Sequence, residues 1–360
     1  MTPASLDRLR DLLKEKDAEL VRVLNERARI SLEIGETKKR NGLEIYDPSQ
    51  ESRIYRRVDG INNGPLTERA LRDIFTEILS ASRALQAPAS VAYLGPEGSF
   101  THAAAQSHFG RGASFSPCPT ILDVFDRVER RKADWGVAPV ENSLEGAVKL
   151  TLDRLLATPL NILGELFLRI NHSLLSRRKG LDGLKRIYSH PQALAQCQEW
   201  IRKNLPHCSL HETDSTAKAA RKVAEDDGAA AIGSGGAAAL YGLAIIAEGI
   251  EDNPSNVTRF LVIGRGTTEP TGRDKTSILM GTRHMPGALY SSLQPFARNK
   301  INLMKIESYP IKGSMWEYLF FVDFDGHVEE DKIVECLEDL GRHATFLKIL
   351  GSYPMGDPQP

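Results

Sequence analysis

The N-terminal stretch constrains the fold most, because it carries the pattern of one long helix. From Leu6 to about Lys39 the chain has no proline, and apolar residues recur at positions 6, 9, 13, 20, 23, 24, 30 and 34. That is the spacing of one helix face. A helix of this length extends about 50 Å at roughly 1.5 Å per residue. A small domain cannot cover so long an apolar stripe, so we expect a second chain to complete the module.

Two further helices follow in the pattern. Asn41-Gly42 is a stop signal, and Asp47-Pro48-Ser49-Gln50 supplies an N-cap, a proline at the first helical position and a capping-box glutamine. A third helix is expected from about Leu66 to Gln86. At four helix positions of this module the periodic pattern calls for an apolar residue but the chain has a polar one. Any single residue of this kind could lie at the surface, but four of them favour a polar pocket. These four are Arg27, Lys38, Ser82 and Gln86.

The composition excludes several classes of function. Of the 360 residues, 41% are apolar and 26% are charged, which is typical of two or three soluble domains. With 46 basic and 47 acidic residues the net charge is −1, so we expect neither nucleic acid nor a membrane as a partner. The four cysteines form no C-x-x-C pair, which argues against disulfides and zinc. Without a signal peptide or an apolar run of about 18 residues, we expect a cytoplasmic protein with no bound metal.

Two linker-like segments divide the chain into three expected domains, 1–87, 90–265 and 274–354. The first linker is Ala87-Pro88-Ala89-Ser90, and the second, Gly264 to Asp274, is rich in glycine, threonine and proline. In the second domain short apolar runs alternate with helical patterns, which predicts an α/β fold with parallel sheets covered by helices. The expected strands are Val91–Leu94, Gly136–Val140, Ile187–Ser189, Ala229–Gly233 and Ala244–Ala247.

Five joints in this domain carry hydroxyls, amides or bare backbone N–H groups at expected helix starts. The partial positive charge of a helix N-terminus can receive an anion there without a formal cation. A single joint of this kind is usually a helix cap, but five in one region predict a pocket for a dicarboxylate between two lobes. Asn256, Thr258 and Arg259 add an amide, a hydroxyl and a guanidinium before an apolar run, which offers neutral donors and one cation to a small anion. The joints are Gly95–Thr101, Glu141–Ser143, Ser189–Gln192, Asp214–Thr216 and Ser234–Gly236.

Four segments resemble, in this order, the signatures of the prephenate dehydratase family: Gly95-Pro96-x-Gly98-Ser99-Phe100, Glu141-Asn142-Ser143, Ser189-His190-Pro191-Gln192 and Thr258-Arg259-Phe260. The resemblance implies two α/β lobes like those of periplasmic binding proteins, with the substrate in the cleft. It also implies the pocket residues, which are Asn142, Ser189, Gln196, Thr258 and Arg259, with Glu141, Ser143 and Thr216 beside them.

The reaction that this resemblance implies expels hydroxide and CO₂ from a cyclohexadiene while the ring becomes aromatic. Aromatisation drives the reaction, so no cofactor is expected. We expect Thr258 to polarise the leaving hydroxyl, while the other uncharged pocket residues position the substrate. Arg259 would meet a carboxylate or buttress the site. Glu141 and His190 could supply the proton, although a capping or hydrogen-bonding role is an equal alternative for each.

The helical segment resembles the all-helical chorismate mutases, in the form fused to prephenate dehydratase. By that resemblance the pocket residues are Arg10, Arg27, Lys38, Asp47, Glu51, Ser82 and Gln86. Arginines would bind the carboxylates of chorismate, and a lysine and a glutamine would stabilise charge on the breaking ether oxygen. Arg10 and Arg27 are about 25 Å apart along one helix and about 100° apart around it, so Arg10 must come from a partner subunit to serve the same pocket. Gln50 stands where the family commonly has arginine, which leaves weakened mutase activity open.

The last segment has the βαββαβ order of a ferredoxin-like α+β domain. The expected elements are Thr276–Thr282, Gly287–Arg298, Ile301–Ser308, Glu317–Phe324, Glu329–Leu340 and Thr345–Leu350. Gly287-Ala288-Leu289 and Glu307-Ser308-Tyr309-Pro310 resemble the ACT regulatory domains, which pair their sheets and bind an amino acid at the interface. The implied effector is phenylalanine. Tyr309 replaces the usual arginine of that motif, and a purely structural dimerisation domain is the alternative.

Together these resemblances predict a multidomain homodimer or larger homo-oligomer that converts chorismate to prephenate and prephenate to phenylpyruvate, inhibited by phenylalanine. Two alternatives remain open at this point. One is a dehydratase whose helical module is mainly an oligomeriser with weak mutase activity, because Gln50 departs from the pattern. The other is a non-catalytic sensor of aromatic metabolites.

Overall fold

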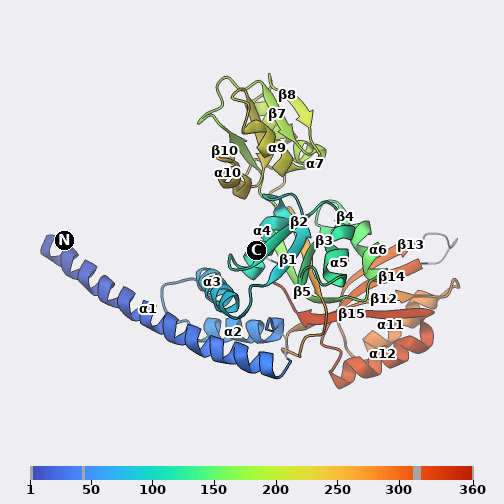
Figure 1. The fold of residues 1–360 in the computed structure, drawn as a ribbon. Helices are drawn as coiled ribbons and strands as arrows, with labels where there is room; N and C mark the ends of the chain where they lie inside the picture. The colour runs from blue at the N-terminus through green and yellow to red at the C-terminus, as the bar shows by residue number, and fades with distance from the viewer. Residues whose placement is uncertain (1–2, 43–44, 311–317, 359–360) are drawn as a thin grey trace. The chain divides into compact units, whose positions relative to one another are not determined.

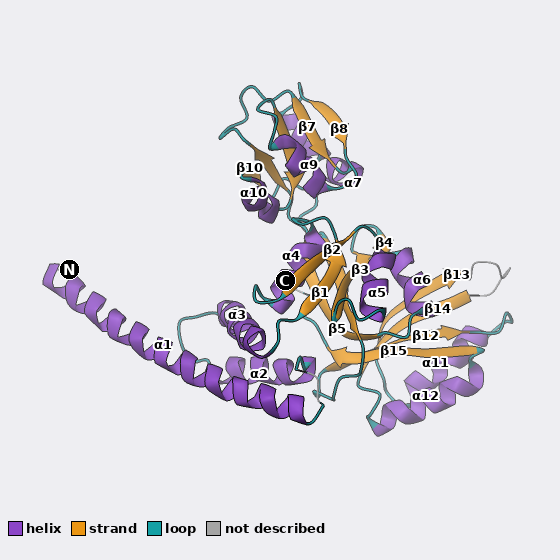
Figure 2. Ribbon diagram, viewed as in Figure 1, coloured by secondary structure: helices purple, strands orange, loops and turns teal. Residues whose placement is uncertain are grey.

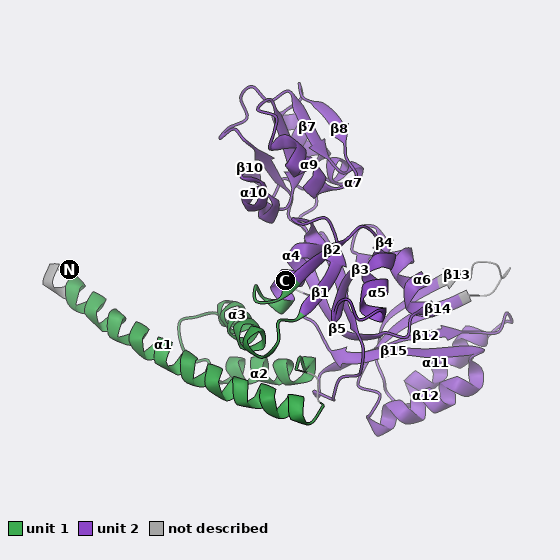
Figure 3. Ribbon diagram, viewed as in Figure 1, with its two compact units in different colours: residues 1–89, 109–114 green, residues 90–108, 115–360 purple. Residues whose placement is uncertain are grey.

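The computed structural model describes residues 3–42, 45–310 and 318–358. The chain forms two compact units (Figure 3). Unit 1 comprises residues 1–89 and 109–114, and unit 2 comprises residues 90–108 and 115–360. None of the helices in the described ranges combines the length and the apolar character that a membrane crossing requires.

Unit 1 is built on the three helices that the sequence predicts: α1 (Pro3–Arg40), α2 (Pro48–Ile61) and α3 (Glu68–Gln86) (Figure 1). Asp47 caps α2, because its Oδ1 accepts a hydrogen bond of 3.0 Å from the backbone N–H of Gln50. Thr67 caps α3 in the same way. Residues 109–114 pack against α3, where the N–H of Gly112 donates to the hydroxyl of Ser80 at 2.8 Å.

Much of α1 keeps large apolar side chains at the surface of this chain. Its C-terminal half reaches α3 through Arg27 and Ser31. The exposed apolar residues are Leu6, Leu9, Leu12, Leu13, Leu20, Val21, Val23, Ile30, Leu32 and Ile34. A contiguous apolar stripe of this size favours association with another surface.

The first lobe of unit 2 is built on a six-stranded sheet with the order β2-β1-β3-β11-β5, in which β4 pairs with β3. Helices α5 and α6 pack their apolar side chains against this sheet, with Phe125 and Leu155 fully buried. The strands are β1 (Ser90–Leu94), β2 (Ser114–Cys118), β3 (Trp135–Asn142), β4 (Gly146–Ala147), β5 (Asn161–Arg169) and β11 (Val257–Gly264). The helices are α4 (Phe100–Phe109), α5 (Ile121–Glu129) and α6 (Lys149–Ala157).

The second lobe contains a five-stranded sheet with the order β10-β6-β9-β7-β8. Its small residues allow close packing, since Ala219, Ala231 and Ala237 are fully buried between helices and sheet. The strands are β6 (Ser173–Ser176), β7 (Arg186–Ser189), β8 (Ser209–Glu212), β9 (Ala229–Gly233) and β10 (Ala244–Glu248). The helices are α7 (Pro191–Gln196), α8 (Gln198–Asn204), α9 (Thr216–Val223) and α10 (Gly235–Tyr241).

Both sheets are mixed, and the prediction of parallel sheets is wrong in this respect. β1 runs parallel to β3, and β7 runs parallel to β8 and β9. By contrast, β11 is antiparallel to β3 and β5, and β6 is antiparallel to β9 and β10. The path of the chain explains the difference. β5 carries the chain out of the first lobe and β11 brings it back beside β5, so these two strands run in opposite directions.

Four of the five predicted joints lie at helix starts. Gly95–Ser99 precedes α4, while His190, Ser215 and Ser234 are the N-caps of α7, α9 and α10. The prediction is wrong for Glu141–Ser143, which ends β3 and turns into the short strand β4 that pairs back with β3. Gly146 has a φ of +79° at this hairpin, a conformation that glycine adopts without strain.

The C-terminal module has the predicted βαββαβ order and one antiparallel sheet with the order β13-β14-β12-β15. Helices α11 and α12 cover one face of this sheet, as Figure 2 shows, and Ile278 and Phe324 pack against them. The other face contributes Leu279, Phe321 and Tyr353 to the core of the first lobe. The elements are β12 (Asp274–Gly281), α11 (Ala288–Arg298), β13 (Leu303–Pro310), β14 (Tyr318–Asp325), α12 (Asp331–His343) and β15 (Phe346–Pro354).

Candidate active sites

A cavity of about 390 Å³ in unit 2 is lined by residues from both lobes. Four of the predicted dehydratase residues line it: Asn142 on β3, Thr258 on β11, Gln196 on α7 and Thr216 at the start of α9. His190, the N-cap of α7, lines it as well. Among the described residues that form its wall there is no lysine or arginine. Asp214 is the acidic residue of this wall, and its carboxylate is paired with Lys218 at 2.6 Å. An anion in this cavity would otherwise meet uncharged donors and helix N-termini.

A chain of side-chain hydrogen bonds runs along this cavity wall. Asn142 Nδ2 donates to Thr258 Oγ1 at 2.9 Å and to Asn256 Oδ1 at 2.7 Å. Asn256 Nδ2 in turn donates to Gln196 Oε1 at 3.1 Å, and His172 Nε2 lies 2.9 Å from the same oxygen. This series of hydrogen bonds connects β3 and β11 of the first lobe to α7 of the second lobe.

Backbone N–H groups determine which side-chain atoms in this series are hydrogen-bond donors. The N–H groups of Leu144 and Glu145 donate to Asn142 Oδ1 at 3.0 and 3.2 Å, so the amide nitrogen of Asn142 must face Asn256 and Thr258. The hydroxyl oxygen of Thr258 therefore accepts a hydrogen bond from Asn142. Its own proton has no acceptor in the part of the chain that the structure describes, so a ligand in the cavity can accept it.

The same reasoning assigns the proton of His172. Gln196 Oε1 is an acceptor, so Nε2 of His172 carries the proton and Nδ1 does not. Nδ1 is buried and has no hydrogen-bond partner within the described ranges. Burial lowers the pKa of His172 below its ordinary value, against the opposing effects of the Gln196 hydrogen bond and the Glu251 carboxylate. At neutral pH the ring is therefore an uncharged donor that orients Gln196.

Two predicted pocket residues are outside the lining of this cavity. Ser189 is fully buried, and its hydroxyl donates to the carbonyl of Ile232 at 2.7 Å, which ties β7 to β9. Ser143 Oγ donates to the carbonyl of Ser255 at 3.2 Å and accepts from the N–H of Val257 at 3.0 Å. Both hydroxyls therefore support the strands that carry the site.

Arg259 and Glu141 are also outside the lining. Arg259 Nη1 lies 2.5 Å from Asp323 Oδ2, and only 5% of the arginine side chain is exposed. Glu141 Oε1 lies 2.7 Å from the ammonium of Lys305. Successive side chains of a strand point to opposite faces, so Thr258 and Arg259 cannot both face one cavity. Of the two roles expected for Arg259, this arrangement fits a buttress and not a contact with a substrate carboxylate.

In unit 1 the polar residues that interrupt the apolar faces of α1 and α3 form hydrogen bonds between elements. Arg27 Nη1 of α1 donates to Ser82 Oγ of α3 at 2.8 Å, and Gln86 Nε2 of α3 donates to Ser31 Oγ of α1 at 2.7 Å. Lys38 Nζ donates at 3.0 Å to a backbone carbonyl in the loop before α2. These residues therefore form a polar layer between the helices, and they do not lie at the surface.

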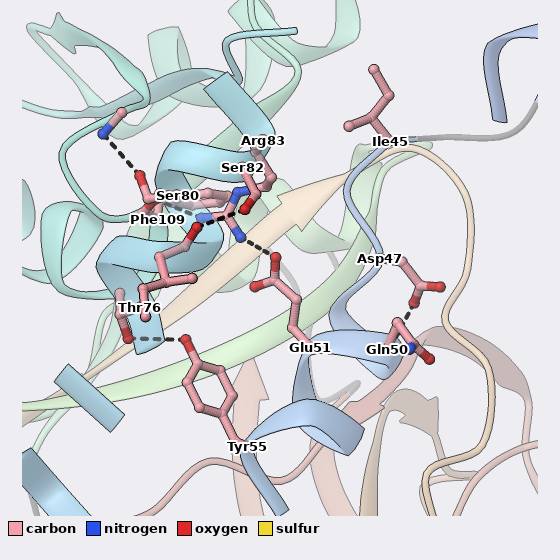
Figure 4. Close-up of polar contacts among 12 residues, drawn as sticks. Ile45, Asp47, Gln50, Glu51, Tyr55, Thr76, Ser80, Ser82, Arg83 and Phe109 are labelled. Carbon is pink, nitrogen blue, oxygen red and sulfur yellow. Dashed lines mark hydrogen bonds and ion pairs between the residues drawn. The ribbon is translucent and has the colours of Figure 1, made fainter. Parts of the chain in front are cut away.

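A buried ion pair lies in the same unit. Figure 4 shows Glu51 of α2 and Arg83 of α3 facing each other, and these two side chains form an ion pair. Arg83 also donates to the carbonyl of Phe109 at 2.6 Å, and its guanidinium lies 5.2 Å from the centre of the Tyr46 ring. Burial raises the pKa of Glu51 and outweighs the attraction of Arg83. The Glu51 carboxyl is therefore protonated more readily than an exposed glutamate.

Arg10 is separate from this polar layer. It lies near the N-terminus of α1, with a side chain that is 64% exposed and 3.2 Å from Asp7. One chain therefore does not bring Arg10 and Arg27 together. Asp47 and Gln50 form the start of α2, where the Asp47 carboxylate accepts the Gln50 N–H (Figure 4).

The predicted effector residues lie on two elements of the C-terminal module. Gly287 has a φ of +81° and is the N-cap of α11, and Ala288 begins this helix. Leu289 packs on the core between helices and sheet. Glu307 and Ser308 lie on the edge strand β13. The side chain of Tyr309 is outside the described residues.

Asn256, whose amide the sequence indicates as a donor beside Thr258, lies between Asn142 and Gln196 in the hydrogen bonds of the cavity wall. Two further polar residues of these sites, Arg83 and His172, are not indicated by the sequence. No local pattern marks His172 or Arg83. Their partners Gln196 and Glu51 lie 24 and 32 residues away in the sequence.

Comparisons with known proteins agree with this arrangement. Residues 91–268 match the family model of prephenate dehydratase, and residues 9–87 match that of chorismate mutase type II. The bifunctional chorismate mutase/prephenate dehydratase of Aquifex aeolicus is 45% identical over 97% of this chain and 98% of its own length. The protein of the same name from Neisseria gonorrhoeae is 46% identical over 96% of each chain.

A solved structure extends the agreement to three dimensions. The prephenate dehydratase from Arthrobacter aurescens, crystallised in complex with L-Phe, is 37% identical and superposes with a TM-score of 0.69. The match covers 75% of this chain and 91% of that one. The chain therefore belongs to the family of bifunctional chorismate mutase/prephenate dehydratases.

Proposed function

We propose that this chain rearranges chorismate to prephenate with residues of unit 1 and converts prephenate to phenylpyruvate in the cavity of unit 2. The observation that supports the second step best is the Asn142–Thr258 hydrogen bond at 2.9 Å in the cavity wall. It leaves the Thr258 proton for the substrate. The relatives' names and the two matched family models support both activities.

In the dehydratase step the bond from the ring to the carboxylate breaks, and its electron pair completes the aromatic ring as CO₂ departs. The ring hydroxyl leaves at the same time and takes up one proton to become water. Thr258 would donate a hydrogen bond to that hydroxyl, which stabilises the negative charge that develops on it. A threonine is too weak an acid to deliver the proton alone.

Of the two proton sources that the sequence suggests, His190 fits better than Glu141. His190 is part of the cavity wall, whereas the Glu141 carboxylate is held by Lys305 outside it. The dianion would be held by uncharged donors, among them Thr101, Thr216 and the N–H groups at the start of α9. Asn142 and Gln196 would orient the substrate.

For the mutase step, Arg27, Lys38 and Gln86 would surround chorismate, with Arg10 supplied by a second chain. The exposed apolar stripe of α1 supports such a homodimer or larger homo-oligomer. Gln50 lies at the exposed start of α2. A Gln50→Arg variant that consumes chorismate much faster than the wild type would favour the alternative in which the native module is mainly an oligomeriser.

We also propose that the C-terminal module is an ACT regulatory domain and that L-phenylalanine inhibits the dehydratase through it. The βαββαβ order with its antiparallel sheet supports the first part, and the relative crystallised with L-Phe supports the second. The four cysteines are free, and three are buried, which fits a reducing cytoplasm.

The test is direct turnover by the purified chain. Supplied with prephenate, it should produce phenylpyruvate, and supplied with chorismate, it should consume it. L-phenylalanine should slow the first reaction. Absence of phenylpyruvate would refute the dehydratase function and favour a sensor, and absence of chorismate consumption would refute the mutase function.

A further inference from the structure

The C-terminal module contacts the first lobe through one face of its sheet. On β12 and β14 the residues Ile278 and Phe324 pack on the helices of the module. Their neighbours Ser277 and Asp323 therefore lie on the opposite face, which also carries Tyr353 of β15. This face meets the strands that hold Thr258 and Asn142.

The two site strands have a matching alternation. Thr258 and Asn142 are direct partners in the register of β11 and β3, and the next pair along the same strands is Arg259 and Glu141. The first pair lines the cavity. The second pair lies on the reverse face. Each site residue is therefore adjacent in sequence to a charged residue whose side chain faces the C-terminal module.

Both charged neighbours are held by an opposite charge of the C-terminal module. Arg259 Nη1 lies 2.5 Å from Asp323 Oδ2 of β14, and the arginine also donates to the Tyr353 hydroxyl at 3.0 Å. Glu141 Oε1 lies 2.7 Å from Lys305 Nζ of β13. Two ion pairs therefore connect the two site strands to two strands of the module.

The Arg259 pair belongs to a buried group of four charges, Arg259, Glu165, Lys275 and Asp323, with side-chain exposures of 5, 0, 7 and 1%. The first lobe and the C-terminal module each contribute one cation and one anion. Glu165 Oε1 lies 2.6 Å from Lys275 Nζ, and its Oε2 lies 2.7 Å from Arg259 Nε. The Arg259 Nε–H is not aimed at that oxygen, so this second contact is an ion pair without a directed hydrogen bond.

Burial lowers the pKa of the Arg259 guanidinium, but the adjacent Tyr353 hydroxyl and the carboxylates of Asp323 and Glu165 outweigh this effect and raise the pKa above its ordinary value. The guanidinium is therefore charged. A buried charge cannot move away from its counter-ion at low cost, because little water is present to replace the lost interaction. The position of Asp323 thus restrains Arg259, and with it the backbone that carries Thr258.

We propose that Asp323 and Lys305 are positioning residues of the dehydratase site, acting through Arg259 and Glu141. This inference rests on the proposed dehydratase function. The C-terminal module holds the reverse side of β11 and β3 so that the Thr258 hydroxyl and the Asn142 amide keep their spacing. A displacement of about 1 Å at a reacting group can lower a rate by up to about 100-fold. A ligand that shifts this sheet would therefore change the rate without entering the cavity.

The test compares three variants of the full chain. Asp323→Asn should lower the dehydratase kcat by about ten-fold or more, change KM less and weaken inhibition by L-phenylalanine. Lys305→Met, at a less buried pair, should shift kcat in the same direction by a smaller factor. Lys348→Met is the matched control. Lys348 also joins the module to the first lobe, by donating to the carbonyls of Leu155, Leu156 and Thr158, and these three hydrogen bonds reach the end of α6 instead of β3 or β11.

The mutase rate of each preparation serves as an internal reference, because unit 1 is a separate compact unit. Circular dichroism and the melting temperature show whether each variant is folded. If Asp323→Asn does not fold, Lys305→Met alone decides the outcome. A dehydratase kcat within two-fold of wild type in the folded variants would overturn the inference, as would an equal loss in Lys348→Met. A wild-type chain that forms no phenylpyruvate would instead overturn the proposed function.

Discussion

The side-chain nitrogen of Asn142 lies 2.9 Å from the hydroxyl oxygen of Thr258, although 116 residues separate the two in the sequence. Two backbone N–H groups on the other end of the amide fix its orientation. The hydroxyl of Thr258 is thereby an acceptor toward the protein and a donor toward the cavity. A hydroxide leaving group needs a donor of this kind, because negative charge develops on its oxygen as it departs.

Reversing the polarity of this hydrogen bond should impair the dehydratase. In Asn142→Asp a carboxylate would replace the amide, accept the Thr258 proton and repel a dianionic substrate. We expect kcat for phenylpyruvate formation to fall about 10²–10³-fold, the usual cost of losing one donor to a developing negative charge. Asn63→Asp is the control, because it makes the same change at an exposed position of unit 1. Equal rates for Asn142→Asp and the wild type would contradict the assignment.

The assigned tautomer of His172 predicts different effects of two amide substitutions. The side-chain nitrogen of glutamine can occupy the place of Nε2 and donate to Gln196, whereas asparagine is too short to do so. We therefore expect His172→Gln to retain most dehydratase activity and His172→Asn to lose about ten-fold, the effect of about 1.4 kcal/mol. Steady-state kinetics with prephenate measure both. The opposite order of activities would refute the Nε2–H assignment.

The lowered pKa of His172 predicts how the stability of unit 2 depends on pH. Below the ordinary pKa of 6.5, the unfolded chain binds this proton more readily than the folded chain does. The free energy of unfolding should therefore fall as pH decreases from about 6.5 toward the lowered folded-state pKa. Above about 6.5 this contribution is fully present.

Denaturant unfolding of unit 2 between about pH 5 and 8 measures this slope, which should be smaller in His172→Gln. His102, whose pKa burial also lowers, remains in both proteins as a common background. An unchanged slope in His172→Gln would show that His172 does not carry the effect.

The separation of Arg10 from Arg27 predicts a mutase site shared between chains. Arg10→Ala and Arg27→Ala should each be nearly inactive with chorismate. In a dimer with two shared sites, mixed dimers contain one intact site of two, and random mixing makes half of the dimers mixed. Co-expression of the two variants should therefore restore about a quarter of wild-type activity. A mixture as inactive as either variant alone would argue that each site belongs to one chain.

Local patterns in the sequence predict most elements of this fold, because caps, periodicity and glycine positions act within a few residues. The N-cap Asp47 and the βαββαβ order of the last segment are examples. The direction of β11 could not be predicted in this way. It depends on the chain leaving the first lobe along β5 and returning beside it, which is a property of the path and not of any single strand.

The same distinction applies to the sites. The partners of Arg259 lie 64 and 94 residues away, at Asp323 and Tyr353, and no pattern near Arg259 indicates them. The alternation of side chains along a strand is a local pattern that does bear on Arg259. Adjacent residues of a strand point to opposite faces, so assigning Thr258 to the cavity already excludes Arg259 from it.

The most direct test of the central claim is to measure both reactions in one preparation of Thr258→Ala, with Thr258→Ser as the matched control. Thr258→Ala should lose phenylpyruvate formation by about 10²–10³-fold and consume chorismate at the wild-type rate, because the two sites lie in separate units. Thr258→Ser should retain much of the dehydratase activity, since it keeps the hydroxyl. Unchanged phenylpyruvate formation in Thr258→Ala, or a parallel loss of both reactions, would contradict the account.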